Sequence, residues 1–272
     1  MTPDFAALER VACLLRSRTI ATSSRTGTPH LGSCLSCLDI LTYLYFHHLR
    51  IDPERPDDPG RDRFILSKGH AAPALFQVLA LRGFYPESRL ADYGEDGSHF
   101  AEHPPAPGIV PGIEAATGSL GHGLPIGLGM AIAGRIQKRD YHVFVVLGDG
   151  ECNEGSVWEA AMLAPRQGLT QVTAIIDYNR WQGTGRSDDV LALAPLADKW
   201  RAFGWDCTEI DGHDFAAIDA ALSQQGEKPR AVIAHTVKGK GVSFMEDDNN
   251  WHYRIPTAEE VLLADRELGL TI

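Results

Sequence analysis

The sequence has few of the features that mark a secreted, membrane-bound or nucleic-acid-binding protein. Its five cysteines are odd in number and scattered, which predicts reduced thiols and a cytoplasmic location rather than a disulfide framework. No segment approaches the roughly 18 apolar residues of a membrane span. The N-terminal segment, which contains Asp4 and Glu9, has no apolar stretch of signal-peptide length. A formal net charge of -11 argues against a surface of clustered Lys and Arg. We therefore expect neither a membrane nor a nucleic acid as a partner.

Internal repeats, low-complexity tracts and linkers are also missing. A hydrophobic content of 44% with 22% charged residues is typical of a globular protein. Because no composition shift divides the chain, we predict a single domain that spans residues 1–272.

Apolar runs and helical spacings alternate along the chain. The predicted elements are, in order, helices at 5–22 and 34–49, a strand at 63–67, helices at 73–81 and 121–136, a strand at 142–147, a helix at 154–166, a strand at 172–177, a helix at 195–203, a strand at 205–210, a helix at 214–224 and a strand at 230–236. Strands that alternate with helices and lack period-2 polarity indicate an α/β fold, with a mostly parallel sheet covered by helices on both faces. The segment 94–118 is rich in Gly, Pro and His, and such a long loop suggests a function.

Two polar side chains follow two of these strands directly. Asp149 lies in Gly-Asp-Gly after "FVVL", and Asn179 follows "VTAIID". If the strands are neighbours, both side chains reach the same sheet edge, where parallel sheets bind ligands. A carboxylate and an amide oxygen suit Mg²⁺ or Ca²⁺, and the helix that starts near Glu154 directs backbone N–H groups toward the same place, which suits phosphate. Gly148 and Gly150 allow a sharp turn and a close approach. The pattern predicts a metal-bridged diphosphate site.

The same residues resemble a known family. "GDGECNEGSVWEAA" followed by "IIDYNRWQG" is similar to the thiamine diphosphate signature. The segments "HLGSCLSCLDIL", "FILSKGHAAPALF", "PGIEAATGSLGHGLPIGLGMA" and "HTVKGKGVSFMEDDNNWH" resemble, in order, the N-terminal part of transketolase. The resemblance covers nearly the whole chain.

The resemblance implies a fold, a reaction and a partner. The fold is the three-layer thiamine diphosphate-binding domain, and the reaction is transfer of a two-carbon ketol unit from a ketose, commonly a ketose phosphate, to an aldose. The pyrimidine-binding and C-terminal domains of the family have no counterpart here. The chain therefore resembles the first subunit of a split transketolase, which works with a second subunit in an α2β2 assembly.

The family pattern also assigns site residues. It implies Mg²⁺ (or Ca²⁺) held by Asp149, Asn179 and the carbonyl of Trp181, with Gly148 and Gly150 against the diphosphate. Gly118, Ser119 and Leu120 would line thiamine diphosphate. Glu154 corresponds to a glutamate at the subunit interface near the cofactor; alternatively, it only favours a helix N-terminus.

Histidines fit proton transfer on sugar hydroxyls, because they titrate near neutral pH. By resemblance, His30, His70 and His103 are catalytic, and His70 also lies near the diphosphate. His252 is near a further family histidine, although its alignment leaves its role open. His122 stands where many relatives have Gln, which leaves its role open as well.

Three other interpretations fit parts of the sequence. The chain could be the α subunit of a 2-oxo acid dehydrogenase, which has the same Gly-Asp-Gly and Asn logic, but His30, His70 and His103 favour transketolase. It could also be a non-catalytic thiamine diphosphate-binding protein. Cys34 and Cys37 are neighbours on one helix face, but without a second pair they do not indicate a zinc or redox site.

Overall fold

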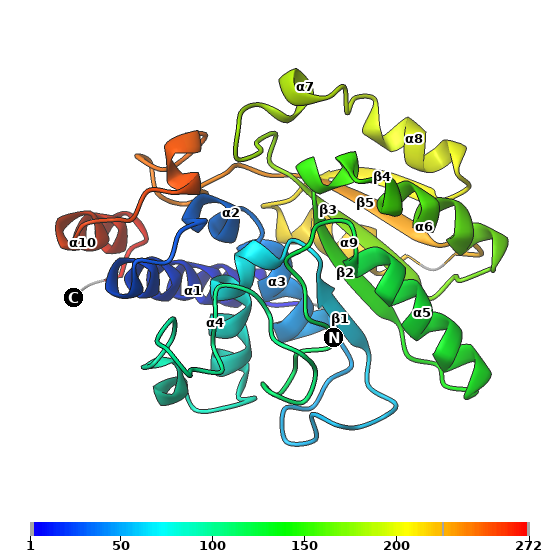
Figure 1. Ribbon diagram of the computed structural model, residues 1–272, viewed down its shortest axis with the longest axis horizontal. Coiled ribbons are helices and arrows are strands. Elements are labelled where there is room, and N and C mark those ends of the chain that lie inside the picture. Colours follow the sequence, from blue (N-terminus) through cyan, green and yellow to red (C-terminus); the bar gives the residue numbers. More distant parts are fainter. Residues whose placement is uncertain (1–2, 225, 271–272) are drawn as a thin grey trace.

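The centre of the molecule is a parallel sheet. The computed structural model describes residues 3–224 and 226–270, and Figure 1 shows the sheet between two groups of helices. Its five strands have the order β1-β2-β3-β5-β4, and every neighbouring pair is parallel. The strands are β1 (Arg63–Leu66), β2 (Val143–Gly148), β3 (Val172–Tyr178), β4 (Asp206–Asp211) and β5 (Arg230–His235). The predicted α/β fold with a parallel sheet is confirmed.

Helices cover both faces of this sheet. On one side lie α1 (Phe5–Thr26), α2 (Leu31–Ser36), α3 (Leu38–Tyr43), α4 (Ala72–Arg82), α9 (Phe215–Leu222) and α10 (Ala258–Glu267), and on the other α5 (Gly123–Ile136), α6 (Gly155–Arg166) and α8 (Leu196–Ala202). The short α7 (Ser187–Val190) lies in the connection between β3 and α8. Strand β2 serves both layers, because Phe144 and Val146 belong to the first core and Val145 and Leu147 to the second. Burial on both faces explains why the strand reads as an unbroken apolar run.

Several boundaries differ from those that the sequence indicated. The helix predicted at 34–49 is divided at Cys37 into α2 and α3, and it ends in a π-helical turn, Leu44–His48. Helix α10 was not predicted, although Thr257 and Glu260 form a reciprocal capping box at its start, a readable signal. Strand β4 lies at the sheet edge and is partly exposed. The segment 94–118 is a loop, as predicted.

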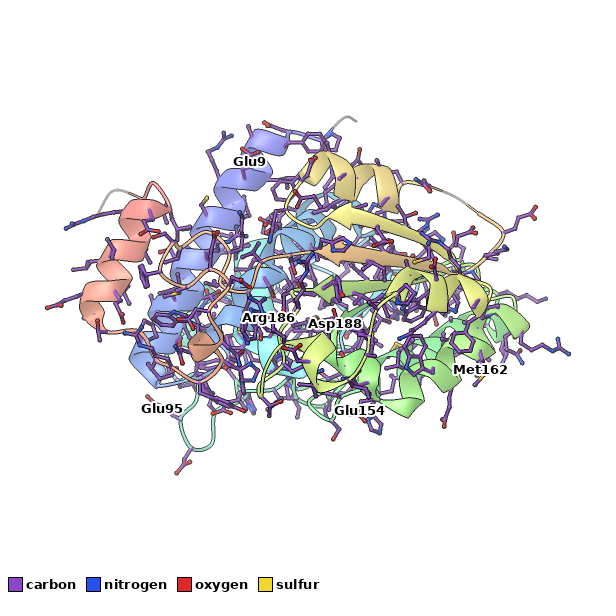
Figure 2. The ribbon with its side chains drawn as sticks, turned by 90° about the horizontal axis from the view of Figure 1, so that it is seen from above. Glu9, Glu95, Glu154, Met162, Arg186 and Asp188 are labelled. Carbon is purple, nitrogen blue, oxygen red and sulfur yellow. The ribbon has the colours of Figure 1, made fainter. Side chains whose placement is uncertain are left out.

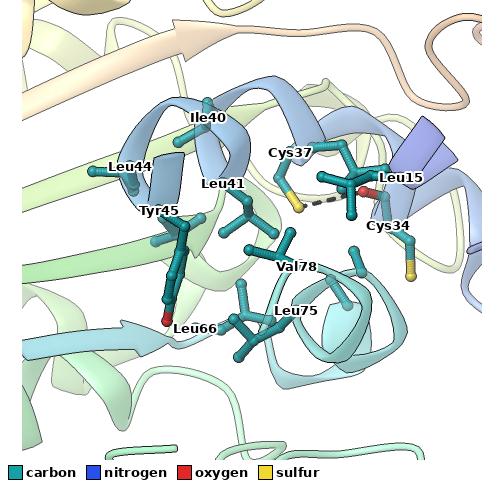
Figure 3. Close-up of a cluster of buried hydrophobic side chains, with 14 of the residues drawn as sticks. Leu15, Cys34, Cys37, Ile40, Leu41, Leu44, Tyr45, Leu66, Leu75 and Val78 are labelled. Carbon is teal, nitrogen blue, oxygen red and sulfur yellow. Dashed lines mark hydrogen bonds between the residues drawn. The ribbon is translucent and has the colours of Figure 1, made fainter. Parts of the chain in front are cut away.

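The cysteines and the apolar segments agree with the composition. Cys34 and Cys37 point into the core between α3 and α4 (Figure 3), and the Cys37 Sγ lies 3.5 Å from the Cys34 carbonyl oxygen. Burial raises the pKa of each thiol to about 12. All five cysteines are free. Among the described residues, no helix is long and apolar enough to cross a membrane.

Candidate active site

The carboxyl ends of β2 and β3 bring the two predicted metal ligands to one edge of the sheet. The strands pair in a register that places Gly148 opposite Asp177. Asp149 follows the first and Asn179 follows the second by two residues. Both side chains are nearly buried, since Asp149 is 1% and Asn179 5% exposed. The expected juxtaposition at the sheet edge is therefore present.

A cavity of about 320 Å³ lies at this edge. Ten residues singled out from the sequence line it: His30, His70, Gly118, Leu120, Gly148, Asp149, Gly150, Glu154, Asn179 and Trp181. His252, whose role was left open, lines it as well. In the described part of the chain, the lining does not include Ser119 or His122, which are both exposed. His103 packs behind the wall, because a Cβ added at Gly118 would lie 2.8 Å from its ring.

The oxygen atoms at the floor of the cavity fit a hard cation. Asp149 accepts a hydrogen bond from Ser187 Oγ (2.8 Å), and no Lys or Arg in residues 3–224 and 226–270 pairs with it. Burial raises the pKa of Asp149 to about 7. Asn179 Oδ1 accepts the N–H of Trp181 (3.0 Å), which directs that residue's backbone toward the same floor. A buried carboxylate beside an amide oxygen is the ligand chemistry of Mg²⁺ and Ca²⁺.

No cluster of three or more His, Cys, Asp or Glu side chains suited to a metal occurs in the described residues. The set derived from the sequence contains only one residue of those types, Asp149, together with an amide and a backbone carbonyl. It is therefore a different kind of donor set, and its assignment stays a prediction.

Glycines leave room for a ligand along two walls of the cavity. A Cβ at Gly150 would lie 2.6 Å from the Gln182 side chain, and one at Gly118 would meet the His103 ring. Gly118 also has φ 147°, a conformation that favours glycine. The residues present thus fit a diphosphate and its metal at the floor, with a ring system between Gly118, Leu120 and the histidines.

Two buried acidic residues that the sequence reasoning missed hold the site together. Lys68 Nζ pairs with Asp177, and it also donates to the Ser33 carbonyl (2.9 Å). Burial opposes both charges, but each partner's charge outweighs it, so the pKa of Lys68 is raised and that of Asp177 is lowered. Glu151 accepts from the N–H groups of Gly121 (2.8 Å) and Gly148 (3.1 Å). It thereby ties the end of β2 to the loop before α5.

Three histidine rings gather at the mouth of the cavity. The ring centroids of His30 and His252 are 4.8 Å apart, and those of His30 and His70 are 5.4 Å apart. Burial lowers the pKa of all three, to about 3 for His252. Neutral imidazoles can accept or donate a proton, as transfer at sugar hydroxyls requires.

His30 is held in an unusual conformation. Its φ is 70°, and its N–H donates to the His252 carbonyl oxygen at 2.7 Å. Its Nδ1 is buried without a hydrogen-bond partner in the described residues. A left-handed non-glycine residue costs about 1–3 kcal/mol and is common at functional sites, which agrees with the role predicted for His30.

Lys238 orients His252. The lysine Nζ lies 3.0 Å from His252 Nδ1 and donates to Asn249 Oδ1 at 2.7 Å. Because an ammonium group has no acceptor, Nδ1 accepts and the imidazole proton is on Nε2. A Cβ at Gly183 would lie 3.2 Å from that Nε2, so this nitrogen is close to the cavity wall. The sequence motif "HTVKGKG" contained Lys238, but only the fold shows which side chain it contacts.

Comparisons with known proteins agree with this geometry. Residues 9–271 match the family described as transketolase, thiamine diphosphate binding domain. One of the two subunits of the apulose-4-phosphate transketolase from Phocaeicola vulgatus is 43% identical over 257 residues, which are 93% of this chain and 91% of that protein. The 6-deoxy-6-sulfo-D-fructose transketolase subunit SqwG of a Clostridium species is 40% identical, over 88% of each chain. Transketolase from Leishmania mexicana superposes with a TM-score of 0.89 at 25% identity, over 96% of this chain and 41% of that one.

The fold and the cavity thus define a thiamine diphosphate-binding domain. The chain belongs to the transketolase family, as the match over 9–271 shows. It has nearly the length of the two bacterial transketolase subunits, and it spans about two fifths of the solved transketolase from Leishmania mexicana. These relatives are transketolases, so the comparisons do not favour the 2-oxo acid dehydrogenase interpretation.

Proposed function

We propose that this chain is the cofactor-binding subunit of a two-chain transketolase. The observation that carries the proposal is the cavity, where Asp149 and Asn179 lie together below His30, His70 and His252. The length of the chain relative to split and solved transketolases supports a second subunit with the pyrimidine-binding and C-terminal domains.

The side chains have separable tasks in this proposal. Asp149, Asn179 and the Trp181 carbonyl would hold Mg²⁺ or Ca²⁺, and Gly148 and Gly150 would lie against the diphosphate. Thiamine diphosphate supplies the carbanion chemistry that breaks and forms the carbon–carbon bond.

The histidines act on the sugar. His30 and His70, kept neutral by burial, would take up and return the protons of substrate hydroxyl groups. His103 would orient the donor sugar from behind Gly118. Ser119 and Glu154 would contact the cofactor or the adjoining subunit.

The relatives' names suggest which substrates to test. Apulose 4-phosphate and 6-deoxy-6-sulfo-D-fructose are the sugars named for two of them, so we propose a ketose phosphate or a ketose with a related anionic group as donor. We also propose an α2β2 assembly and a cytoplasmic location, the latter supported by the odd, scattered cysteines.

The first prediction concerns the need for the partner. The chain alone should transfer no ketol unit, whereas the chain purified with the product of a neighbouring transketolase gene should do so when thiamine diphosphate and Mg²⁺ are present. Donors should include pentose, branched and sulfonated ketoses, and native mass spectrometry should give the stoichiometry. Full ketol transfer by the isolated chain would contradict the split-enzyme proposal. Decarboxylation of a 2-oxo acid by the pair would favour the alternative enzyme class, and cofactor binding by a pair that turns over no substrate would favour a non-catalytic protein.

A further inference from the structure

A short hairpin closes one side of the cavity. Trp181 and Arg186 form an antiparallel bridge, and the Gln182 N–H donates to the Gly185 carbonyl at 2.8 Å. We call residues 181–186 the hairpin. Its inner side faces the floor of the cavity through Trp181, Gln182 and Gly183. Directly after it, Ser187 bonds to Asp149.

The outer side of the hairpin is bound to another loop. The Arg186 guanidinium donates to both carboxylate oxygens of Asp247, at 2.7 and 2.6 Å. It also stacks 3.7 Å above the centre of the Trp181 ring, and the indole N–H donates to the same carboxylate at 2.8 Å. Bidentate pairing and cation–π stacking are each more favourable than a simple surface ion pair. We call Arg186, Trp181 and Asp247 the latch.

A second contact supports the same arrangement. Asn249 Nδ2 donates to the Gly183 carbonyl at 3.3 Å, and Asn249 itself accepts from Lys238. The segment that carries His252 is thus joined to the hairpin at two points.

The backbone at both ends of the latch is strained. Arg180 has φ 66° and Asp247 has φ 57°, although neither is glycine. Such conformations persist only where the surroundings hold them. Asp247 is held by its N–H, which donates to the Lys238 carbonyl at 2.8 Å. In the view from above, Arg186 lies near the middle of the molecule (Figure 2) and not at its rim.

We propose that the latch holds the hairpin closed before the cofactor arrives, so that Arg186, Trp181 and Asp247 are positioning residues for thiamine diphosphate. This inference rests on the proposed function, because it assumes that the floor of the cavity takes the diphosphate and its metal. The latch touches no cavity-facing atom of Asp149 or Asn179. Its effect is on the fraction of molecules in which the hairpin is in place, and apparent affinity falls in proportion to that fraction.

The test uses the two-subunit enzyme and three variants of the latch. Asp247→Ala and Arg186→Ala should weaken the binding of thiamine diphosphate with Mg²⁺, measured by titration calorimetry, by about tenfold. Arg186→Lys should have an intermediate effect, because lysine keeps the charge but loses the fork and the stacking. At saturating cofactor, kcat and the sugar KM should be unchanged. Trypsin should cleave cofactor-free Asp247→Ala faster after Arg180 and Arg186 than the wild-type enzyme.

Arg201→Ala provides the matched control. Arg201 pairs with Asp198 at 2.8 Å on α8 and is about as exposed as Arg186, but it does not line the cavity. Its removal should leave cofactor affinity unchanged. If Asp247→Ala binds the cofactor within twofold of the wild type, the latch inference is wrong. A lowered melting temperature of the cofactor-free enzyme, or a lowered kcat at saturation, would indicate a general structural role and overturn it too. Failure of the wild-type enzyme to bind thiamine diphosphate would instead overturn the proposed function.

Discussion

Asp149 and Asp177 lie at the ends of neighbouring strands, are equally buried and have opposite surroundings. Asp177 pairs with Lys68 and accepts hydrogen bonds from Ser36 and Thr236. Asp149 accepts from Ser187, and none of the described Lys or Arg side chains pairs with it. The pKa of Asp177 is lowered by Lys68 against the effect of burial, whereas burial raises that of Asp149 to about 7.

This contrast separates a structural carboxylate from a functional one. A buried charge is costly unless it is paired, so Asp177 with its lysine is a complete unit that joins β3 to the end of β1. Asp149 bears the cost of burial without an internal cation, an arrangement that suits a ligand for an external one. Three predictions follow from the contrast, and they run from the largest expected effect to the smallest.

Removing the lysine should make Asp177 as poorly compensated as Asp149. Lys68→Met leaves the Asp177 carboxylate buried without its partner, and we expect the free energy of unfolding to fall by about 3–5 kcal/mol, measured by urea denaturation of the chain. Lys240→Met is the control, because Lys240 is partly exposed and lies 3.5 Å from Glu246. If Lys68→Met were no more destabilising than Lys240→Met, the assignment of Asp177 as a structural carboxylate would be wrong.

Neutralising Asp149 should have the opposite distribution of effects. Asp149→Asn keeps an acceptor for Ser187 and removes a buried charge, so the stability of the chain should change by less than about 1 kcal/mol. Thiamine diphosphate- and Mg²⁺-dependent activity of the two-subunit enzyme should fall by at least about a hundredfold, because one of few anionic ligands is lost. Unchanged turnover in a steady-state assay would remove Asp149 from the metal site.

A paired carboxylate far from the cavity should affect stability alone. Asp39 on α3 is bound by Arg16 (3.0 and 2.6 Å) and lies 2.7 Å from His213 Nδ1. Burial opposes its ionisation, but the Arg16 charge and these hydrogen bonds hold the pKa of Asp39 at about 2, below the ordinary 3.8.

The sign of the pH effect follows from that lowered pKa. The ionised carboxylate stabilises the fold above about pH 4, and this contribution of about 2 kcal/mol disappears as the pH falls toward 2. Asp39→Asn should lack this part of the acid-induced loss of stability in urea titrations at pH 2–5. Equal pH dependence in the variant and the wild type would contradict the pairing.

The sequence predicted the strands of the sheet better than the helices around it. The runs "FVVL" and "VTAIID" are buried on both faces, and such strands leave an unambiguous apolar signal. The helix over 34–49 was less predictable, because tertiary packing and not propensity divides it at Cys37. Helix α10 has a polar surface, and only its capping box, Thr257 with Glu260, signals it.

The candidate site shows the same division. Asp149 and Asn179 were recognisable because each directly follows a strand, and the sheet itself brings strand ends together. Lys68, Glu151 and Lys238 were missed, since their importance depends on which side chains they contact across the fold. No local pattern distinguishes Lys68, which is buried and paired, from an exposed lysine. Glu151 could have been noticed, because it directly follows Gly-Asp-Gly.

The pairing of Gly148 with Asp177 has a consequence for how this protein can change in evolution. The distance between Asp149 and Asn179 is measured by the hydrogen bonds of two parallel strands and not by the chain that connects them. The turn that joins α6 to β3 can therefore gain or lose residues while the two side chains keep their places. A single residue inserted within β2 would instead turn its side chains to the opposite face. The connecting turn is thus open to variation in length, whereas the strands are not.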